Sequence, residues 1–551
     1  MFSDPVIGDD FFGRREVLDL LVKRASALKS GYRQNVAVIG HQQLGKTSLL
    51  RQFLHTYSDP GTLTIYVEIR RHALDSFIEQ FSRALLYQFL KSRGKAADAL
   101  EPLAALIDKA AAEVPLTTRR VQDIEALLKH RKPEEAYARV FELTSVLRQE
   151  TGLNCIVVLD EFHRLGEFGV RNAFSDFGKR IMIQKETMYL LSSSSFTASR
   201  KILAEKLALL FGHFERIYLE PFDFDTAFDF LDKKLSPLAT DEGLKNYVVA
   251  LTDGHPFFLD AIADRLKESA LAHGETTVSV ASLAEALRKL LFESQGSLHQ
   301  YFLKLISPWT APNAHGCQLL VLERLAGGVN KLPELAESLH RPQAEIARQL
   351  QELLSYELIT KNGVFYRFTN KLFKFWLREV HQAKELSLLD TAEQAGRFTA
   401  RIRAHYAEHA DWTAMAASAR IRDLLGRFNE ELIEFGEKKK RLPRFREFIS
   451  CPGEATPGGG SRALIAKADG RCWVCRITEG RADEKEVLAL TRGAEQAQNP
   501  AATKVLIALG GFDENARLLA KEKRVMTLGL AKVNLLLDVY GKAPIVSRAV
   551  S

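Results

Sequence analysis

An apolar run leads into a glycine-bounded loop near the start of the chain, and it reads Val36-Ala37-Val38-Ile39-Gly40-His41-Gln42-Gln43-Leu44-Gly45-Lys46-Thr47-Ser48-Leu49-Leu50. The β-branched residues before Gly40 predict a buried strand, and the apolar pattern after Thr47 predicts a helix. Gly40 and the Gly-Lys-Thr triplet at 45–47 have the spacing of the P-loop, a phosphate-binding turn between a strand and a helix. The stretch therefore predicts a parallel α/β core with a nucleotide site.

Each residue type in this loop has a role in binding phosphate. Glycines let backbone N–H groups close around phosphate oxygens, and the positive end of the following helix adds attraction. The Lys46 ammonium would reach the β- and γ-phosphates, and the Thr47 hydroxyl would be a ligand of Mg²⁺. The alternative is a glycine-containing turn beside a surface lysine. The loop residues predicted to bind nucleotide are Gly40, His41, Gln42, Gln43, Leu44, Gly45, Lys46, Thr47 and Ser48.

A second apolar run ends in two acids and reads Cys155-Ile156-Val157-Val158-Leu159-Asp160-Glu161-Phe162. A continuous apolar run of this length fits a strand that is buried on both faces, as in a parallel sheet. Asp160 would hold Mg²⁺ at its end, and Glu161 would orient or deprotonate the attacking water. The alternative is that the two acids only cap the next helix.

Three weaker patterns accompany these motifs. Residues 63–69 predict a further parallel strand, and residues 188–195 predict another that ends in serines. At such a strand end in P-loop ATPases a polar residue senses the γ-phosphate, so Ser193 and Ser194 are candidates, against a solvated serine turn. An aromatic-Gly-Arg turn that contains Gly13 and Arg14 could lie against the adenine.

Composition limits the class of protein. The chain has 551 residues, which suggests three or four domains, and its 46% hydrophobic and 26% charged residues are typical of a globular protein. No stretch approaches the eighteen or so apolar residues of a membrane span, and no signal peptide is seen. Five cysteines do not make a disulfide framework. We therefore expect a cytoplasmic protein that has no membrane partner.

Only two of the cysteines have the spacing of metal ligands. Cys472 and Cys475 form a CxxC without a second pair of ligands. The pair lies in a predicted strand, where residues three apart point to opposite faces. We therefore do not expect zinc there.

The positive charge is concentrated in the last third of the chain. Residues 377–551 contain 29 Lys and Arg against 23 Asp and Glu, which accounts for +6 of the net charge of +7. A basic run at Lys438–Arg441, followed by Arg444 and Arg446, lies in a segment predicted to be helical over 387–448. Such a region favours nucleic acid, although a solvated charged face is the alternative.

A third unit is predicted over residues 301–385. Helical patterns cover 317–327, 332–340 and 343–355, and a hairpin built on Asn-Gly follows over 358–368. Three helices and a hairpin make a winged helix, which is either a DNA-reading module or a packing and dimer module. The residues on or beside its third helix that could read DNA are Arg341, Gln343, Arg348 and Gln349.

Residues 222–300 predict a helical unit, interrupted by a turn at Gly254-His255-Pro256. The C-terminal region predicts an α/β unit with its own core. Its expected strands cover 463–466, 472–477, 504–509 and 525–528, and its expected helices cover 484–498, 513–522 and 531–540.

Taken together, these motifs resemble the archaeal-type P-loop ATPases of the STAND/AAA+ grouping over about residues 10–380. The resemblance includes the ending Phe368-Thr369-Asn370-Lys371-Leu372-Phe373-Lys374-Phe375-Trp376. It implies an ATPase core that binds ATP and Mg²⁺, a helical lid in which Pro256 lies near the nucleotide, and a winged helix. The family often has an arginine where His213 stands in Phe211-Gly212-His213, and Arg216 lies three residues further on. The resemblance therefore leaves the presence and identity of an arginine finger open.

The C-terminal region resembles a degenerate restriction-endonuclease-like fold of the PD-(D/E)xK type. Ala463 stands in place of the family's aspartate, and Arg476-Ile477-Thr478 stands in place of Glu-x-Lys. Glu479 lies close by but cannot replace the missing set. Such a domain would bind or assemble but would not cut DNA.

The predicted fold class is α/β, with a P-loop sheet, a helical lid, a winged helix and a C-terminal nuclease-like domain. The leading hypothesis is an ATP-hydrolysing switch, with Lys46 and Glu161 as catalytic residues, that couples nucleotide state to DNA or to a protein partner, including self-assembly. The alternative is a DNA-binding assembly factor that uses ATP as a structural ligand. The predicted domains are 1–220 ATPase core, 221–300 lid, 301–385 winged helix, 386–448 helical connector and 449–551 nuclease-like domain.

Overall fold

A computed structural model describes residues 4–70, 73–207, 214–310, 316–386, 388, 390–435, 438–450, 462–496 and 502–546. The chain divides into two compact units, Met1–Pro221 and Phe222–Ser551, and each is described by itself. Within these ranges, no helix combines the length and the apolar character that a membrane crossing requires.

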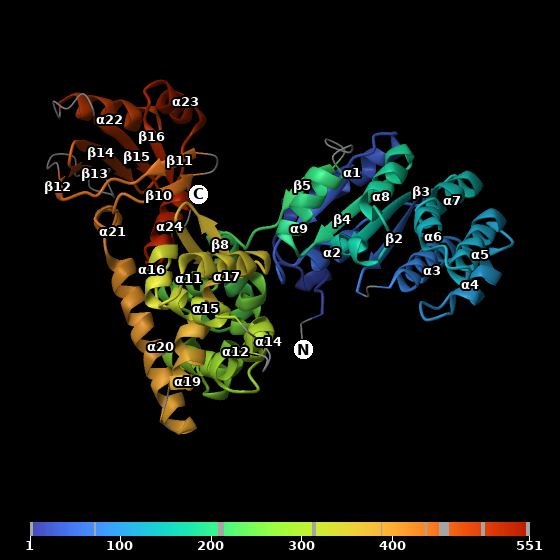
Figure 1. The fold of residues 1–551 in the computed structure, drawn as a ribbon, viewed down its shortest axis with the longest axis horizontal. Helices are drawn as coiled ribbons and strands as arrows, with labels where there is room; N and C mark the ends of the chain where they lie inside the picture. The colour runs from blue at the N-terminus through green and yellow to red at the C-terminus, as the bar shows by residue number, and fades with distance from the viewer. Residues whose placement is uncertain are drawn as a thin grey trace. The chain divides into compact units, whose positions relative to one another are not determined.

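The first unit contains a five-stranded sheet in the order β2-β3-β4-β1-β5, with every neighbouring pair parallel (Figure 1). Strands β1 to β4 coincide with the apolar runs in the sequence, as predicted. Strand β5 is not predicted, because Phe-Glu-Arg-Ile-Tyr lacks an apolar run. In the structure Glu215 of this strand accepts a hydrogen bond from Arg24 Nε at 2.7 Å. The strands are β1 (Asn35–Ile39), β2 (Thr62–Glu68), β3 (Asn154–Asp160), β4 (Thr187–Ser193) and β5 (Phe214–Tyr218).

Helices cover both faces of this sheet because alternate strand residues point in opposite directions. Val36 and Val38 pack with helices α1 and α2, whereas Ala37 and Ile39 belong to the larger cluster formed with α3 to α8. The helices are α1 (Arg15–Lys29), α2 (Lys46–Thr56), α3 (Leu74–Ser92), α4 (Leu103–Ala110), α5 (Pro115–Lys129), α6 (Pro133–Val140), α7 (Leu143–Thr151), α8 (Ala173–Ile183) and α9 (Phe196–Lys201).

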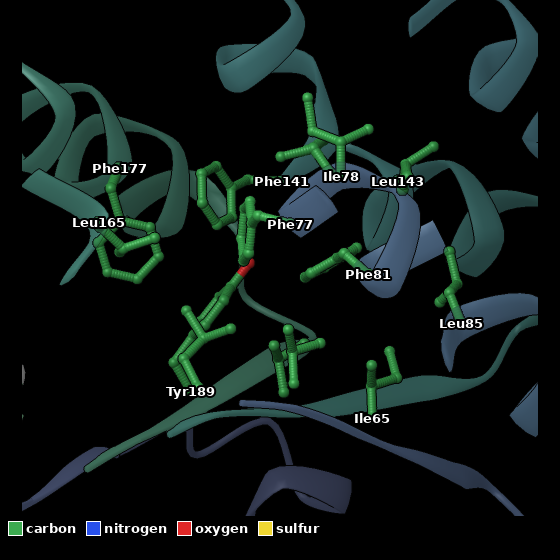
Figure 2. Close-up of a cluster of buried hydrophobic side chains, with 14 of the residues drawn as sticks. Ile65, Phe77, Ile78, Phe81, Leu85, Phe141, Leu143, Leu165, Phe177 and Tyr189 are labelled. Atoms are coloured by element: carbon green, nitrogen blue, oxygen red, sulfur yellow. The ribbon is translucent and has the colours of Figure 1, made fainter. Parts of the chain in front are cut away.

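The larger cluster is rich in aromatic rings (Figure 2). Phe77 and Phe81 of α3 lie beside Phe141, with ring centroids 6.0 and 6.1 Å from it. Phe177 of α8 contacts both Phe141 and the ring of Tyr189 from β4. This packing fixes the sheet from one side and holds the strand ends in place, where the functional residues emerge.

The second unit begins with helices and continues with the three helices and hairpin expected from the sequence. Strands β8 and β9 pair antiparallel around Gly363-Val364. The elements are α10 (Phe224–Leu235), β6 (Ala239–Thr240), α11 (Glu242–Thr252), α12 (Pro256–Ala272), β7 (Thr277–Val278), α13 (Val280–Leu287), α14 (Ser297–Thr310), α15 (Gln318–Ala326), α16 (Leu332–Ser338), α17 (Gln343–Ser355), β8 (Ile359–Asn362), β9 (Phe365–Phe368), α18 (Lys371–Trp376), η6 (Leu377–His381), α19 (Gln382–Leu386), α20 (Thr391–Ala414) and α21 (Ala417–Leu425).

The β8–β9 hairpin is joined to the C-terminal region. The Val364 N–H donates to the Leu432 carbonyl at 3.1 Å, and the Asn362 side chain exchanges two 2.9 Å hydrogen bonds with the Glu434 backbone. Arg367 of β9 pairs with Asp538 at 2.7 Å. The hairpin therefore serves as a packing element within this unit.

A second five-stranded sheet follows, in the order β12-β13-β14-β15-β16 (Figure 1). The first two pairings are antiparallel and the last two are parallel. The α/β elements match those expected from the sequence, except that β12 is not predicted. They are β12 (Glu447–Ser450), β13 (Arg462–Ala468), β14 (Arg471–Thr478), α22 (Glu484–Gln496), β15 (Thr503–Ala508), α23 (Glu514–Glu522), β16 (Met526–Gly529) and α24 (Leu530–Val539). Cys472 and Cys475 belong to different core clusters on the two faces of this sheet, so they cannot bind one ion together.

Two expectations about basic or polar residues are wrong. The segment predicted to be helical up to residue 448 is helical only to Leu425, and Lys438–Arg441 forms strand β11, which pairs with β10 (Leu432–Phe435). Pairing with β10, whose Ile433 is buried, overrides the local pattern. Gln349 is 5% exposed because it faces the interior from α17, so it is not available to read DNA.

His409 of α20 is a buried histidine, and we expect it to make the second unit sensitive to acid. Its side chain is 6% exposed and its ring centroid lies 5.5 Å from that of Tyr247 on α11. Burial, with the nearby charges of His405 and Arg420, lowers the pKa of His409 from 6.5 to about 4. Because the pKa of His409 is lower in the folded state, the unfolded state binds a proton at this residue first as the pH falls below 6.5. The free energy of unfolding therefore decreases as the pH falls from 6.5 toward 4, and this effect is absent well above pH 6.5.

We expect the free energy of unfolding to fall by up to about 2 kcal/mol from this residue between pH 7 and pH 5. His409→Gln should reduce the acid sensitivity, because a glutamine does not bind a proton in the unfolded state. Denaturant unfolding at both pH values, followed by circular dichroism, measures the difference between the two proteins. An equal fall in both would contradict this role, and His55→Ala, an exposed histidine on α2, is the control.

Candidate nucleotide-binding and catalytic site

The predicted loop lies between β1 and α2, at the carboxyl edge of the parallel sheet, as required of a phosphate-binding turn. Gln43 and Gly45 have φ of +61° and +85°, in the left-handed region. Gly45 occupies the N-cap of α2 and has no side chain that could cap the first turn. In any α-helix the N–H groups of the first turn have no intrahelical acceptor, so this helix end is suited to an anion.

The end of β5 encloses the loop closely. A Cβ on Gly40 would lie 2.6 Å from the Leu219 carbonyl oxygen, so only glycine fits there. Leu44 is buried in the cluster with α1 and α2, which anchors the middle of the loop. The loop backbone is therefore held by the core on one side and by the segment after β5 on the other.

Lys46 is the buried cation of this loop, with 5% of its surface exposed. Its Nζ donates to the His41 carbonyl at 2.7 Å, which folds the side chain over the loop. The His41 ring stacks on Phe196 of α9 at 5.9 Å. Gln42 is exposed at the loop surface. The ammonium thus lies beside the loop N–H groups, where a phosphate would be bound.

Ser48 and the Gly13-Arg14 turn are held by other segments of the first unit. The Ser48 hydroxyl accepts a hydrogen bond from the Val6 N–H at 3.2 Å. Gly13 and Arg14 both have positive φ, and the Arg14 guanidinium donates to the Glu220 carbonyl. Their roles in nucleotide binding stay predictions.

Asp160, at the end of β3, is 1% exposed and accepts hydrogen bonds from three hydroxyl groups. Its Oδ2 accepts from Thr47 Oγ1 at 2.7 Å and from the Tyr66 hydroxyl at 2.8 Å, and its Oδ1 accepts from Ser192. Burial, together with the negative charge of Asp160, raises the pKa of Tyr66, so this hydroxyl remains a donor. Tyr66 and Ser192 are not predicted from the sequence.

The pairing of Thr47 with Asp160 fits a magnesium ion. Adjacent oxygens around octahedral Mg²⁺ lie about 2.9 Å apart, because each is about 2.0–2.1 Å from the metal. The 2.7 Å between Thr47 Oγ1 and Asp160 Oδ2 is close to that separation, and both are oxygen donors. These two side chains could therefore hold the ion with little movement.

Glu161 follows with a left-handed backbone, at φ +59°. Its Oε2 accepts from the N–H and the hydroxyl of Ser194, at 2.9 and 2.8 Å. The same oxygen lies 3.3 Å from Nδ1 of His163, which is 2.8 Å from Ser193 Oγ. The two serines predicted from the β4 end are thus both connected to Glu161, Ser194 directly and Ser193 through His163.

His163 lies in η2 (Phe162–Glu167), two residues after Glu161. His163 is not among the residues predicted from the sequence, although the Asp-Glu-x-His spacing at 160–163 is visible there. Two further predicted positions lie elsewhere. Pro256 is the first residue of α12 in the second unit, and its role stays a prediction. The Phe211-Gly212-His213 segment lies outside the described residues.

The first unit therefore brings a cation, a hydroxyl and two carboxylates to one edge of a parallel sheet, beside a helix N-terminus. Lys46 and the loop N–H groups suit phosphate oxygens, and Thr47 with Asp160 suits a hard cation. Glu161 lies next to Asp160 and could orient a water. This chemistry fits nucleotide binding and phosphoryl transfer to water.

Comparisons with solved structures give distant likenesses. One is the Walker-type ATPase paby2304 of Pyrococcus abyssi, 18% identical, with 68% of this chain and 98% of that chain covered at a TM-score of 0.48. The Aeropyrum pernix ORC2 protein, in ADPNP-ADP complexes, is 14% identical over 70% and 98% of the two chains, with a TM-score of 0.44. The Aeropyrum pernix ORC1 protein in complex with DNA is 15% identical over 69% and 95%, with a TM-score of 0.37.

A search of curated proteins finds no match. Residues 10–177 of the first unit match the family model described as the AAA ATPase domain. The match includes the P-loop, Thr47, Asp160, Glu161 and His163. This part of the chain is therefore similar to an AAA ATPase domain.

Proposed function

We propose that this protein binds and hydrolyses ATP and passes its nucleotide state to DNA or to a protein partner. The observation that carries the proposal is the direct hydrogen bond between Thr47 and Asp160, with Glu161 adjacent, at the edge where the P-loop ends. It joins the two motifs, 113 residues apart in the chain, into one site. The match of residues 10–177 to an AAA ATPase domain also supports it.

The residues would divide the work between binding and hydrolysis. The loop N–H groups and Lys46 would hold the β- and γ-phosphates, with the Lys46 amine moving from the His41 carbonyl to phosphate oxygens. Thr47 and Asp160 would hold Mg²⁺, which neutralises charge on the phosphate oxygens when it is bound. Glu161 would orient the attacking water or accept its proton, while Ser194 and His163 keep the Glu161 carboxylate in place.

The alternative is an assembly factor that binds ATP but turns it over slowly. One observation favours it, because Ser194 and His163 already surround Glu161 Oε2. A carboxylate held in this way is less free to accept a proton from water. A steady-state ATPase assay on the full chain, with and without duplex DNA, distinguishes the two. If adding Mg²⁺ and duplex DNA leaves the rate of ATP hydrolysis at the background rate of the purified protein, the switch hypothesis is contradicted.

For the second unit we propose a winged helix that contributes DNA contacts through α17. Gln343 and Arg348 are exposed on this helix, and Arg341 lies just before it and pairs with Glu345 at 3.3 Å. The β8–β9 hairpin is packed against β10, so contacts would come from the helix and not from the wing. The basic β11 would contribute less, because Lys439 lies 3.3 Å from Glu434.

Duplex DNA binding should depend strongly on salt if phosphate contacts are made. We expect affinity, measured by fluorescence anisotropy, to fall by about tenfold or more between 50 and 200 mM salt. Arg348→Ala should lower the affinity and reduce the salt slope by about 1, because one phosphate contact is lost. Arg119→Ala, an exposed arginine on α5 of the first unit, is the matched control. A flat salt response would contradict the DNA proposal.

For the C-terminal sheet we propose a nuclease-like domain that does not cut DNA. Ala463 lies on β13 and offers no metal ligand. The Arg476 guanidinium on β14 pairs with Glu486 of α22, so the position expected to carry a catalytic acid holds an ion pair. We propose that this domain binds a partner or assembles with copies of itself. The cytoplasm remains the expected compartment, on the sequence grounds given above.

A further inference from the structure

Three ligand-type side chains converge in the second unit, apart from the nucleotide site. Glu323 comes from α15, His381 from the last residue of η6, and Glu385 from α19. One possible ligand atom from each lies within 4.8 Å of the other two. Glu323 is 9% exposed, whereas the Glu385 side chain is 56% exposed. The group is therefore closed on one side and open to solvent on the other.

Two buried atoms of this group face each other but make no hydrogen bond among the described residues. Glu323 Oε1 and His381 Nδ1 have no hydrogen-bond partner among the described residues. They lie 3.5 Å apart, which is longer than a normal N–H···O bond. Two ligands on a tetrahedral ion, each about 2.1 Å from it, are about 3.4 Å apart. The separation is thus that of two neighbouring metal ligands.

We propose that Glu323, His381 and Glu385 bind one divalent transition-metal ion of the zinc type. An imidazole with two carboxylates favours zinc and its neighbours over Mg²⁺ or Ca²⁺, which take oxygen ligands. His381 and Glu385 are four residues apart on consecutive helical turns, so both reach the same face. Water would complete the tetrahedron on the open side, where Glu385 is exposed.

The surroundings are compatible with a bound cation. The nearest lysine in the sequence, Lys384, turns its amine to the Phe292 carbonyl at 2.5 Å and lies over the Phe292 ring. The buried Trp376 ring lies 5.4 Å from the His381 ring. The ion would tie α15 to the segment that leads to α20. This proposal does not depend on ATP or on DNA binding.

The test uses the full chain, freed of metal by a chelator and kept free of nucleotide. Zn²⁺ is titrated by calorimetry, Mg²⁺ is the comparison, and the absorption spectrum of added Co²⁺ reports the coordination. We expect one equivalent of Zn²⁺ to bind and Mg²⁺ not to compete for it. Glu323→Gln, which keeps the shape of the side chain but removes its charge, should weaken binding by more than about tenfold. His381→Ala should do the same.

Controls separate this site from chance binding by the other histidines. His55→Ala on α2 and Glu337→Gln on α16 are exposed positions outside the group, and they should leave the affinity unchanged. If His381→Ala fails to fold, Glu385→Gln gives the same test at an exposed residue. Absence of stoichiometric zinc binding, or binding that Glu323→Gln and Glu385→Gln leave unchanged, would overturn the proposal.

Discussion

Replacing Lys46 with alanine is expected to weaken ATP binding by about 100-fold or more. Truncating one partner of a buried, charge-assisted contact costs about 2–5 kcal/mol, and 1.4 kcal/mol is a factor of ten. Lys46 is the buried cation next to the loop proposed to bind phosphate, and its Nζ lies 2.7 Å from the His41 carbonyl oxygen. Equilibrium titration with a fluorescent ATP analogue in the presence of Mg²⁺ measures the dissociation constant.

Two variants control this experiment. Lys46→Met keeps most of the side-chain volume in a buried position, so it separates loss of the charge from loss of packing. His55→Ala removes an exposed side chain near the end of α2, away from the loop, and its ATP affinity should stay within about threefold of the wild type. ATP affinity that Lys46→Met leaves unchanged would show that phosphate is not bound at this loop.

The substitution Glu161→Gln is expected to lower steady-state ATP hydrolysis by about 10²–10³-fold while ATP affinity stays within about threefold. General-base catalysis contributes on this scale, and a glutamine cannot take the proton of the attacking water. The amide has the same shape, so its oxygen can still accept the two hydrogen bonds from Ser194, at 2.9 and 2.8 Å in the wild type. Phosphate release and nucleotide binding are measured on the same preparations.

Ser194→Ala tests whether the surrounding donors position this carboxylate. It removes the hydroxyl but leaves the backbone N–H, so we expect turnover to change by several-fold, much less than in Glu161→Gln. If turnover is equal in the wild type and in Glu161→Gln, Glu161 is not the base. The assembly-factor alternative, in which ATP is a structural ligand, would then be favoured.

The sequence was sufficient for the P-loop strand, the acidic strand and their helices, because these signals are local. A buried parallel strand needs a continuous apolar run, and a phosphate loop needs glycines at fixed spacing, so Val36–Thr47 and Cys155–Glu161 were visible directly. The edge strand β5 was not, since an edge pairs on one side only and tolerates charges such as Glu215. The basic β11 was missed because its strand conformation comes from pairing with β10.

The composition of the site depended on the tertiary structure. Tyr66 and Ser192 come from β2 and β4, and no spacing rule links them to Asp160. Their roles follow from the packing of strands that are far apart in the chain. The same reason explains Gln349, which looks like a polar surface residue in the sequence but faces the core because of the helix phase.

The amino-acid sequence by itself determined the class of chemistry, because the residues that bind phosphate and metal must follow particular strands at particular spacings. Only the tertiary structure decided which side chains surround them, since hydrogen-bond partners such as Ser194 for Glu161 lie 33 residues away. It also decided that the β8–β9 hairpin packs on the C-terminal region and that Glu323 meets His381. Contacts between distant segments depend on the packing of the whole core, which no local pattern encodes.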